Sequence, residues 1–180
     1  LLPLRDFESF VGQHQADRYV KRLTCRNQLS ILLYAQATGK SSLRDIQTGL
    51  TIRDSTWYHL GLETAARSTL AKANENRPSQ IYESLFYKLL EKCGSFHSGT
   101  ASAFSFRNDL RAIDSTTVDL CLHLFPWARF RTEKGAIKLH TVLTRRLPQC
   151  VLVTDGKTHD RRAVQDLHFE PDDLLIFDRA

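Results

Sequence analysis

The chain contains one strand-like run with a carboxylate at its centre, Arg111-Ala112-Ile113-Asp114-Ser115-Thr116-Thr117-Val118. A second apolar run, Leu174-Leu175-Ile176-Phe177, ends directly at Asp178. A carboxylate flanked by apolar strand residues is costly to bury unless a cation or hydrogen bonds stabilise it. Asp114 and Asp178 together therefore suggest a site for a divalent metal ion. The alternative is that one or both are aspartates on the surface at a strand end.

The pattern around these two runs alternates short apolar segments with turn signals. It predicts a helix over 159–167, and turns at Asp155-Gly156 and at 170–173. The expected strands are 112–118, 137–143, 150–154 and 174–177. The order β-β-β-α-β is typical of an α/β layer architecture, in which a right-handed crossover returns the last strand beside the first. Asp114 and Asp178 would then lie on neighbouring strands.

The first half of the chain carries apolar residues at helical spacing. A helix over 27–37 is expected to stop at Gly39, and a second, capped by Ser41, to place Leu43, Ile46 and Leu50 on one face. This pair is compatible with a helix-turn-helix, although short helix pairs are also common in other all-α domains. Further helices are expected over 62–73 and from Pro78 to about Gly94.

Small and polar residues over 94–100 predict a linker, and divide the chain into an α-helical domain (1–100) and a second domain (101–180). The resulting fold class is α+β or α/β. The composition, 42% hydrophobic and 25% charged, is that of an ordinary soluble protein. The chain lacks the ~20-residue apolar run that spans a membrane, and it shows no signal peptide, so cytoplasmic residence is expected. Four cysteines without a CxxC pair indicate free thiols.

The net charge of +5 is concentrated in one segment. Between Cys121 and Cys150 the only acidic residue is Glu133, and the basic residues are Arg129, Arg131, Lys134, Lys138, Arg145 and Arg146. A basic segment attracts nucleic acid, but it can equally be a solvated loop. The chain contains no methionine, even at position 1, and it ends just after Asp178, so we expect a piece of a longer protein.

Several ordered motifs carry a resemblance to a known family. They are Ala112-Ile113-Asp114-Ser115-Thr116-Thr117, Leu124-Phe125-Pro126-Trp127-Ala128-Arg129-Phe130-Arg131, Lys134-Gly135-Ala136-Ile137-Lys138-Leu139-His140-Thr141, Thr154-Asp155-Gly156-Lys157-Thr158-His159-Asp160 and Asp178-Arg179. Together they resemble the catalytic core of bacterial insertion-sequence transposases of the DDE class. The branch is the one with a Tyr-Arg-Glu-Lys signature. The stretch Ser42-Leu43-Arg44-Asp45-Ile46 is similar to the helical domain before that core.

This resemblance implies a truncated RNase H-like core after a helical domain that recognises transposon ends. It also implies metal-dependent DNA strand cleavage and transfer with Mg²⁺ or Mn²⁺ and no organic cofactor. Asp114 matches the first catalytic aspartate of the family and Asp178 the second. The third acid, a Glu, is expected beyond Ala180, so this chain alone is expected to have little or no activity. The implied partner is double-stranded DNA, as transposon terminal repeats and target DNA, and the protein can be a homo-oligomer.

Other polar residues of this half fit two readings each. Arg129, Arg131 and Lys134 are the best candidates for DNA backbone contacts. Lys138 and His140 share one side of a strand, and either meet a phosphate near Asp114 or face solvent. His159 matches a family motif and either orients the site or only starts a helix. Two rival functions stay open: a DNA-binding protein that occupies transposon ends without cutting, and a metal-dependent nuclease. Asp155 and Asp160 fit turn and N-cap roles better.

Overall fold

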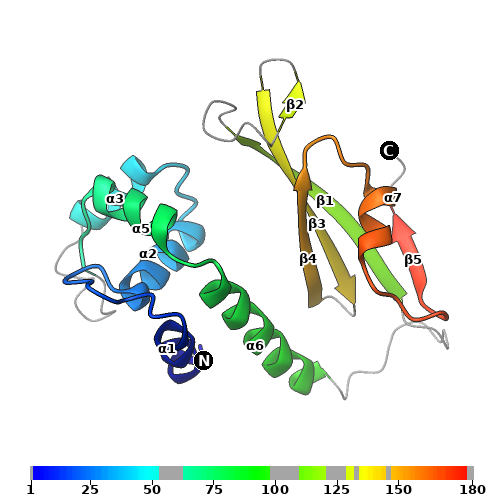
Figure 1. Ribbon diagram of the computed structural model, residues 1–180, viewed down its shortest axis with the longest axis horizontal. Helices are drawn as coiled ribbons and strands as arrows, with labels where there is room; N and C mark the ends of the chain where they lie inside the picture. Colours follow the sequence, from blue (N-terminus) through cyan, green and yellow to red (C-terminus); the bar gives the residue numbers. More distant parts are fainter. Residues whose placement is uncertain are drawn as a thin grey trace. The chain divides into compact units, whose positions relative to one another are not determined.

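The computed structural model describes residues 2–52, 63–97, 110–120, 129–131, 134–144 and 147–177 (Figure 1). The chain divides into two compact units, Leu1–Leu89 and Leu90–Ala180. The first is helical, and the second contains a mixed sheet with a short helix, which agrees with the α+β class. Among the described residues, every helix is too short or too polar to span a bilayer.

The helical unit is built around α2 (Cys25–Ala37), which starts two residues before the helix predicted from the sequence. Thr24 caps it, because its hydroxyl oxygen accepts a hydrogen bond from the Asn27 backbone at 3.2 Å. The predicted stop at Gly39 is confirmed, and its φ of +63° is a left-handed conformation that glycine adopts without strain. The following helix is α3 (Leu43–Ile52).

The predicted cap of α3 was wrong by one residue. The Ser42 hydroxyl accepts the hydrogen bond from the Asp45 backbone at 3.1 Å, whereas Ser41 donates to the Asp45 carboxylate at 2.9 Å. Both serines lie close enough to the first turn to cap the helix, and only the observed helix geometry shows which of them does so. The predicted inner face is confirmed, since Ile46 and Leu50 are buried and Leu43 packs against the same cluster.

Three boundaries differ from the sequence prediction. Residues 63–66 are not helical, so α5 (Arg67–Asn76) begins after an extended Ala66 and continues through the break expected at 74–77. Helix α6 (Gln80–His97) starts after Pro78 and continues past Gly94, where a linker was predicted. A glycine inside a helix costs only about 1 kcal/mol. The buried Ile81 and Leu85 anchor α6 upstream of it. Residue 62 lies outside the described part.

Helix α2 is buried on two sides because two hydrophobic clusters meet it. One side packs with α3 and α5 through Ile31 and Ala35, and the other with α6 and α1 (Leu4–Gln13) through Cys25 and Leu29. Burial raises the pKa of the Cys25 thiol to about 12, and the hydrogen bond with Asp17 adds to the shift. Cys25 and Cys150 are free thiols, as predicted, and Cys121 lies outside the described residues.

A buried arginine joins the end of α5 to the start of α2. Arg77 donates to the Gln28 side chain at 2.6 Å and to the backbone carbonyls of Thr24 and Leu23. Its second nitrogen lies 3.5 Å from the Asp17 carboxylate, which also accepts from the Cys25 backbone at 2.8 Å. These contacts satisfy polar groups that the two apolar clusters would otherwise leave without partners.

The sheet contains all four predicted strands and one short extra strand. β1 (Leu110–Leu120) lies between β3 (Lys134–Thr144), which is antiparallel to it, and β5 (Leu174–Phe177), which is parallel. β4 (Leu147–Asp155) and the short β2 (Arg129–Arg131) both pair with β3. The expected return of the last strand beside the first is therefore confirmed (Figure 1).

The helix predicted over 159–167 is shorter than expected. It consists of α7 (Asp160–Ala163) and a 3-10 turn over Val164–Asp166, after which Leu167 is extended. Ala163 is the one buried residue in these two segments, so little apolar surface is buried that would stabilise a longer helix.

We predict that Arg77→Ala lowers the free energy of unfolding of the helical unit by about 3 kcal/mol, because it leaves buried acceptors and the Asp17 carboxylate unpaired. Urea denaturation followed by helical circular dichroism measures the change. Arg67→Ala, at an exposed site on the same helix, is the control and should shift stability by less than about 0.5 kcal/mol. Equal effects of the two variants would contradict the structural role of Arg77.

Candidate functional site

The register of the sheet sorts its side chains onto two faces. Residues opposite each other on paired strands point to the same side, so Ser115 shares a face with His140, and Asp114 shares the other with Thr141. We call the side of His140 the covered face, because α7 contacts it. The side of Asp114 is the open face. Six of its apolar side chains are exposed: Leu110, Val118, Val151, Val153, Leu174 and Ile176.

Asp114 lies in the middle of β1 and is exposed on the open face. One carboxylate oxygen accepts a hydrogen bond from the Ser115 backbone at 2.8 Å. It forms no ion pair with any residue that the structure describes. Its negative charge is therefore not neutralised locally, in contrast to that of Asp160, which pairs with Lys138 on the covered face.

Asp178 lies outside the described residues, but the strand that precedes it is placed. Parallel pairing of β5 with β1 matches Ile113 with Phe177, and these are the residues immediately before Asp114 and Asp178 in the sequence. The two apolar runs that carry the predicted aspartates are thus direct neighbours in the sheet.

A polar cluster fills the covered face beneath α7. The Asp160 carboxylate lies 3.1 Å from the Lys138 ammonium and 3.0 Å from Nδ1 of His140. Nε2 of His140 is 2.8 Å from the hydroxyl of Thr154. The ring of His140 is completely buried. The Asp160–Lys138 ion pair thus joins α7 to β3, and His140 bridges Asp160 and Thr154 of β4.

The cluster lowers the pKa values of His140 and Asp160. Burial lowers the pKa of His140 below its ordinary value of 6.5, and the nearby Lys138 charge adds to this, although Asp160 opposes it. Burial would raise the pKa of Asp160, but hydrogen bonds from Lys138 and Ser115 outweigh it and lower the value overall. At neutral pH the cluster therefore holds an ionised Asp160–Lys138 pair beside a neutral imidazole.

Several candidate residues occupy positions that the sequence left open. Lys138 and His140 lie on the face opposite Asp114, so the geometry does not bring them to a phosphate there. Asp160, predicted as an N-cap, is instead the first residue of α7 and pairs with Lys138, because His159 holds the cap position. His159 is exposed and makes no side-chain capping hydrogen bond. The turn role of Asp155 is confirmed, since its carboxylate accepts from the Thr158 hydroxyl at 2.6 Å.

Three candidate DNA-contacting residues of the basic segment are described only in their backbone. Arg129 and Arg131 form β2, where they pair with Gly135 and Lys134 of β3. The side chains of Arg129, Arg131 and Lys134 lie outside what the structure describes. Their contact with DNA stays a prediction.

Sequence reasoning missed the contact that ties β1 to the turn before β5. Nε of Arg111 lies 2.5 Å from the Asp173 carboxylate, and its guanidinium lies over the ring of Phe169 at 5.9 Å from the centroid. The hydrogen bond from Arg111 lowers the pKa of Asp173. The available signal was an arginine at the start of the strand and an acidic turn before its parallel neighbour.

Comparison with known proteins gives two similarities. Residues 1–63 match the model of a domain of unknown function, DUF4372. A stretch of 122 residues is 31% identical to a probable transposase for the insertion sequence element IS5377 from Geobacillus stearothermophilus. The match covers 67% of this chain but only 31% of that relative, so the chain corresponds to about a third of its length. No solved structure matches the chain.

These similarities support a transposase-related protein. The relative supports the insertion-sequence part of the sequence-based resemblance. Within the described ranges, no three His, Cys, Asp or Glu side chains gather closely enough to hold a metal ion. Asp178 is not among those ranges, so this absence does not bear on a metal site that includes it.

We predict that the sheet unit loses stability as the pH falls below about 6.5. Folding lowers the pKa of His140, so the unfolded chain takes up a proton that the folded state disfavours. The stability is complete above the unfolded pKa and decreases as the pH falls toward the folded one. Urea denaturation followed by Trp127 fluorescence in a Trp57→Phe background measures it.

The control for this prediction replaces a different histidine. His140→Gln should flatten the dependence of stability on pH between 7.5 and 5, whereas the exposed His159→Gln should leave it unchanged. A His140→Gln variant with the same pH dependence as the parent would show that another group causes the loss.

Proposed function

We propose that this chain is part of a DDE-class transposase, whose RNase H-like core cleaves and joins DNA strands with the help of Mg²⁺ or Mn²⁺. The observation that carries the proposal is the parallel register of β1 and β5. It pairs Ile113 with Phe177, and the next residue of each strand is one of the two aspartates that the family resemblance marks as catalytic.

The topology of the sheet supports the RNase H-like core. Three long strands, β1, β3 and β4, follow one another in antiparallel pairing, and β5 joins the free edge of β1 in parallel after a short helix. Such a parallel return needs a crossover connection, which α7 and the turn after it supply here. The similarity to an insertion-sequence transposase supports DNA as the substrate.

The donor chemistry of Asp114 fits a hard divalent cation. Its carboxylate is exposed and has no cationic partner among the described residues. Carboxylate oxygens are the ligands that Mg²⁺ and Mn²⁺ prefer. Asp160 and Asp173 are less suited, because they are paired with Lys138 and Arg111. We propose that Asp114 and Asp178 hold the ion, together with a Glu from beyond Ala180.

The reaction would proceed in two steps. Water attacks a phosphodiester at the end of the element, the bond to the 3′-oxygen breaks, and the products are a 3′-hydroxyl and a 5′-phosphate. The 3′-hydroxyl then attacks a phosphodiester of the target DNA and displaces a 3′-hydroxyl from it. A bound divalent ion would supply Lewis acidity to the attacking and leaving oxygens.

The remaining polar residues receive distinct roles in this proposal. Arg129, Arg131 and Lys134 would contact the DNA backbone, because they form the basic segment beside the β2–β3 pairing. Lys138 would act as a structural cation, since its ammonium is paired with Asp160 on the covered face. His159 is exposed at the start of α7 and is free to approach DNA.

We predict that Asp114→Asn weakens Mn²⁺ binding by at least about tenfold without unfolding the chain, because it removes a charged ligand from an exposed position. Isothermal titration calorimetry measures the affinity, and circular dichroism checks the fold. Asp119→Asn, an exposed substitution on the opposite face of the same strand, is the matched control. Unchanged Mn²⁺ affinity in Asp114→Asn would refute the metal site.

Strand cleavage separates the proposal from its two rivals. The parent protein, extended beyond Ala180, should nick transposon-end DNA in Mn²⁺ and lose this activity with Asp114→Asn. Cleavage of any duplex without preference for the ends would favour a nuclease. Salt-dependent DNA binding without metal-dependent nicking would favour a non-catalytic protein that occupies the ends.

A further inference from the structure

The helical unit contains a hollow of about 770 Å³ that is lined by basic side chains. It opens between the α1–α2 connection and one side of α5. None of its lining residues is an aspartate or a glutamate. The basic residues that line it are His14, Arg18, Lys21, Arg22, Lys72 and Arg77.

Most of these cations have no counter-charge. Lys21, Arg22 and Lys72 are exposed and form no ion pair with any described residue. Arg18 is also exposed, and it bonds only to the neutral Gln15 side chain and covers the Tyr19 ring. Like charges gathered in a concave surface repel one another, and their combined field attracts anions into it.

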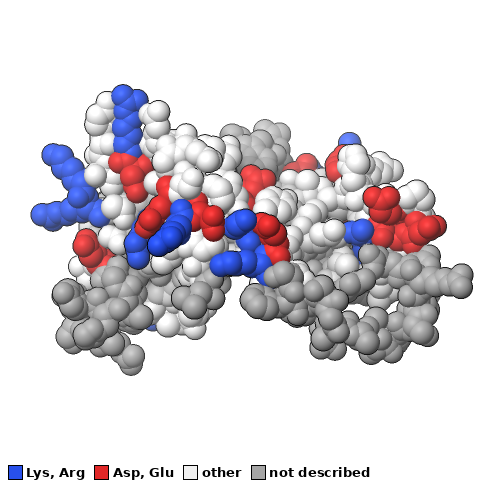
Figure 2. Space-filling model, turned by 90° about the horizontal axis from the view of Figure 1, so that it is seen from below, with Lys and Arg blue, Asp and Glu red and all other residues white. Residues whose placement is uncertain are grey.

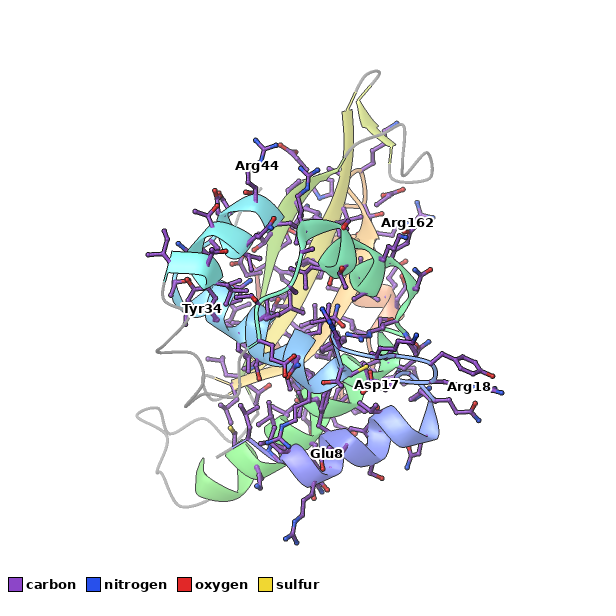
Figure 3. The ribbon with its side chains drawn as sticks, turned by 90° about the vertical axis from the view of Figure 1, so that its left-hand side faces the viewer. Glu8, Asp17, Arg18, Tyr34, Arg44 and Arg162 are labelled. Atoms are coloured by element: carbon purple, nitrogen blue, oxygen red, sulfur yellow. The ribbon has the colours of Figure 1, made fainter. Side chains whose placement is uncertain are left out.

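The positions of the cations suit an extended anion. They come from two segments far apart in the sequence, the α1–α2 connection and α5, so their charges are spread over the hollow. Figure 2 shows basic side chains projecting from the helical unit, at the left of its view. In Figure 3, Arg18 extends outward from the α1–α2 connection.

The buried network beside the hollow fixes this arrangement. Arg77 forms one wall, and its hydrogen bonds to Gln28 and to the carbonyls of Leu23 and Thr24 hold the connection against the end of α5. Asp17 is the nearest acidic residue in the connection, and its carboxylate is directed to Arg77 and to the Cys25 backbone. It therefore does not neutralise the exposed cations, and the hollow is formed before any ligand arrives.

We propose that this basic hollow binds the phosphate backbone of duplex DNA without reading its sequence. The inference rests on the proposed function, and it gives the protein a DNA contact in the helical unit, separate from the metal site of the sheet unit. Contacts to phosphates position a protein on DNA and carry no direct sequence information. Arg18, Lys21, Arg22 and Lys72 make these contacts, and Arg77 holds the wall in place.

The test compares two variants of the 180-residue chain that lose the same charge. Lys21→Gln, Arg22→Gln and Lys72→Gln together remove three cations from the hollow. Arg5→Gln, Arg44→Gln and Arg67→Gln together remove three exposed cations outside it. Fluorescence anisotropy with short labelled duplexes of two unrelated sequences gives the affinity over a range of KCl concentrations. Circular dichroism confirms that both variants are folded.

The hollow variant should bind both duplexes roughly tenfold more weakly than the parent, with a salt dependence reduced by about three ion equivalents. The control variant should lose much less. An equal loss in both variants, or no loss in the hollow variant, would overturn the proposal. A parent chain that binds neither duplex would overturn it as well.

Two further arms identify the source of a failure. The hollow variant should keep the Mn²⁺ affinity of the parent. Asp114→Asn should weaken Mn²⁺ binding and leave the hollow unaffected, so the two variants test the hollow and the proposed function separately. Inorganic phosphate should displace the duplex no better than KCl at matched ionic strength. Stronger displacement by phosphate would assign the hollow to small phosphorylated molecules and refute a duplex site.

Discussion

The sheet unit depends on the hydrogen-bonded pairing of β1 with β3 on one edge and with β5 on the other. The side-chain period of a strand is two residues, so a slip of one residue would exchange the two faces completely. Ile113 and Val142, only 4% and 3% exposed, would move into solvent, and Asp114 would move beneath α7. Burial of these two side chains thus fixes the register, and the ion pair of Arg111 with Asp173 holds the start of β5 in the same register.

The same register divides the carboxylates into two electrostatic classes. Asp160 and Asp173 are each next to a cation, so the pKa of both is lowered and both act as structural anions. Asp114 on β1 forms no ion pair with any described residue. A protein that needed Asp114 only for folding would gain more from a neutral polar residue there, because an unpaired charge among apolar neighbours adds no stability. This contrast supports the proposal that Asp114 binds a ligand, whereas the other two carboxylates stabilise the fold.

Local patterns in the sequence were sufficient for the strands but not for the contacts between them. The runs at 112–118, 137–143, 150–154 and 174–177 are apolar enough to specify strands, and the return of β5 beside β1 followed from general rules of chain crossover. The cap of α3 and the ends of α5 and α6 were less certain, because adjacent residues there have similar propensities. The pairing of Asp160 with Lys138 and His140 could not be predicted, since it depends on the position at which α7 packs against the sheet. Asp114 was singled out from its apolar flanks and from the family resemblance, and its role stays a prediction, as does that of Asp178, which lies outside the described residues.

The helical unit extends further than its sequence similarity. The match to the domain of unknown function ends at residue 63, whereas both hydrophobic clusters need later residues. Leu70 and Ala73 of α5 complete the cluster around Ile31, and Ile81 and Leu85 of α6 complete the one around Phe7. A fragment ending at residue 63 would expose both sides of α2 and would also lack Arg77, which satisfies Gln28 and the carbonyls before α2. The core and the basic hollow therefore share Arg77, because the arginine that completes the core also forms the wall of the hollow. Any change that loosens the start of α2 should consequently disturb the hollow as well, even when it leaves every exposed cation in place.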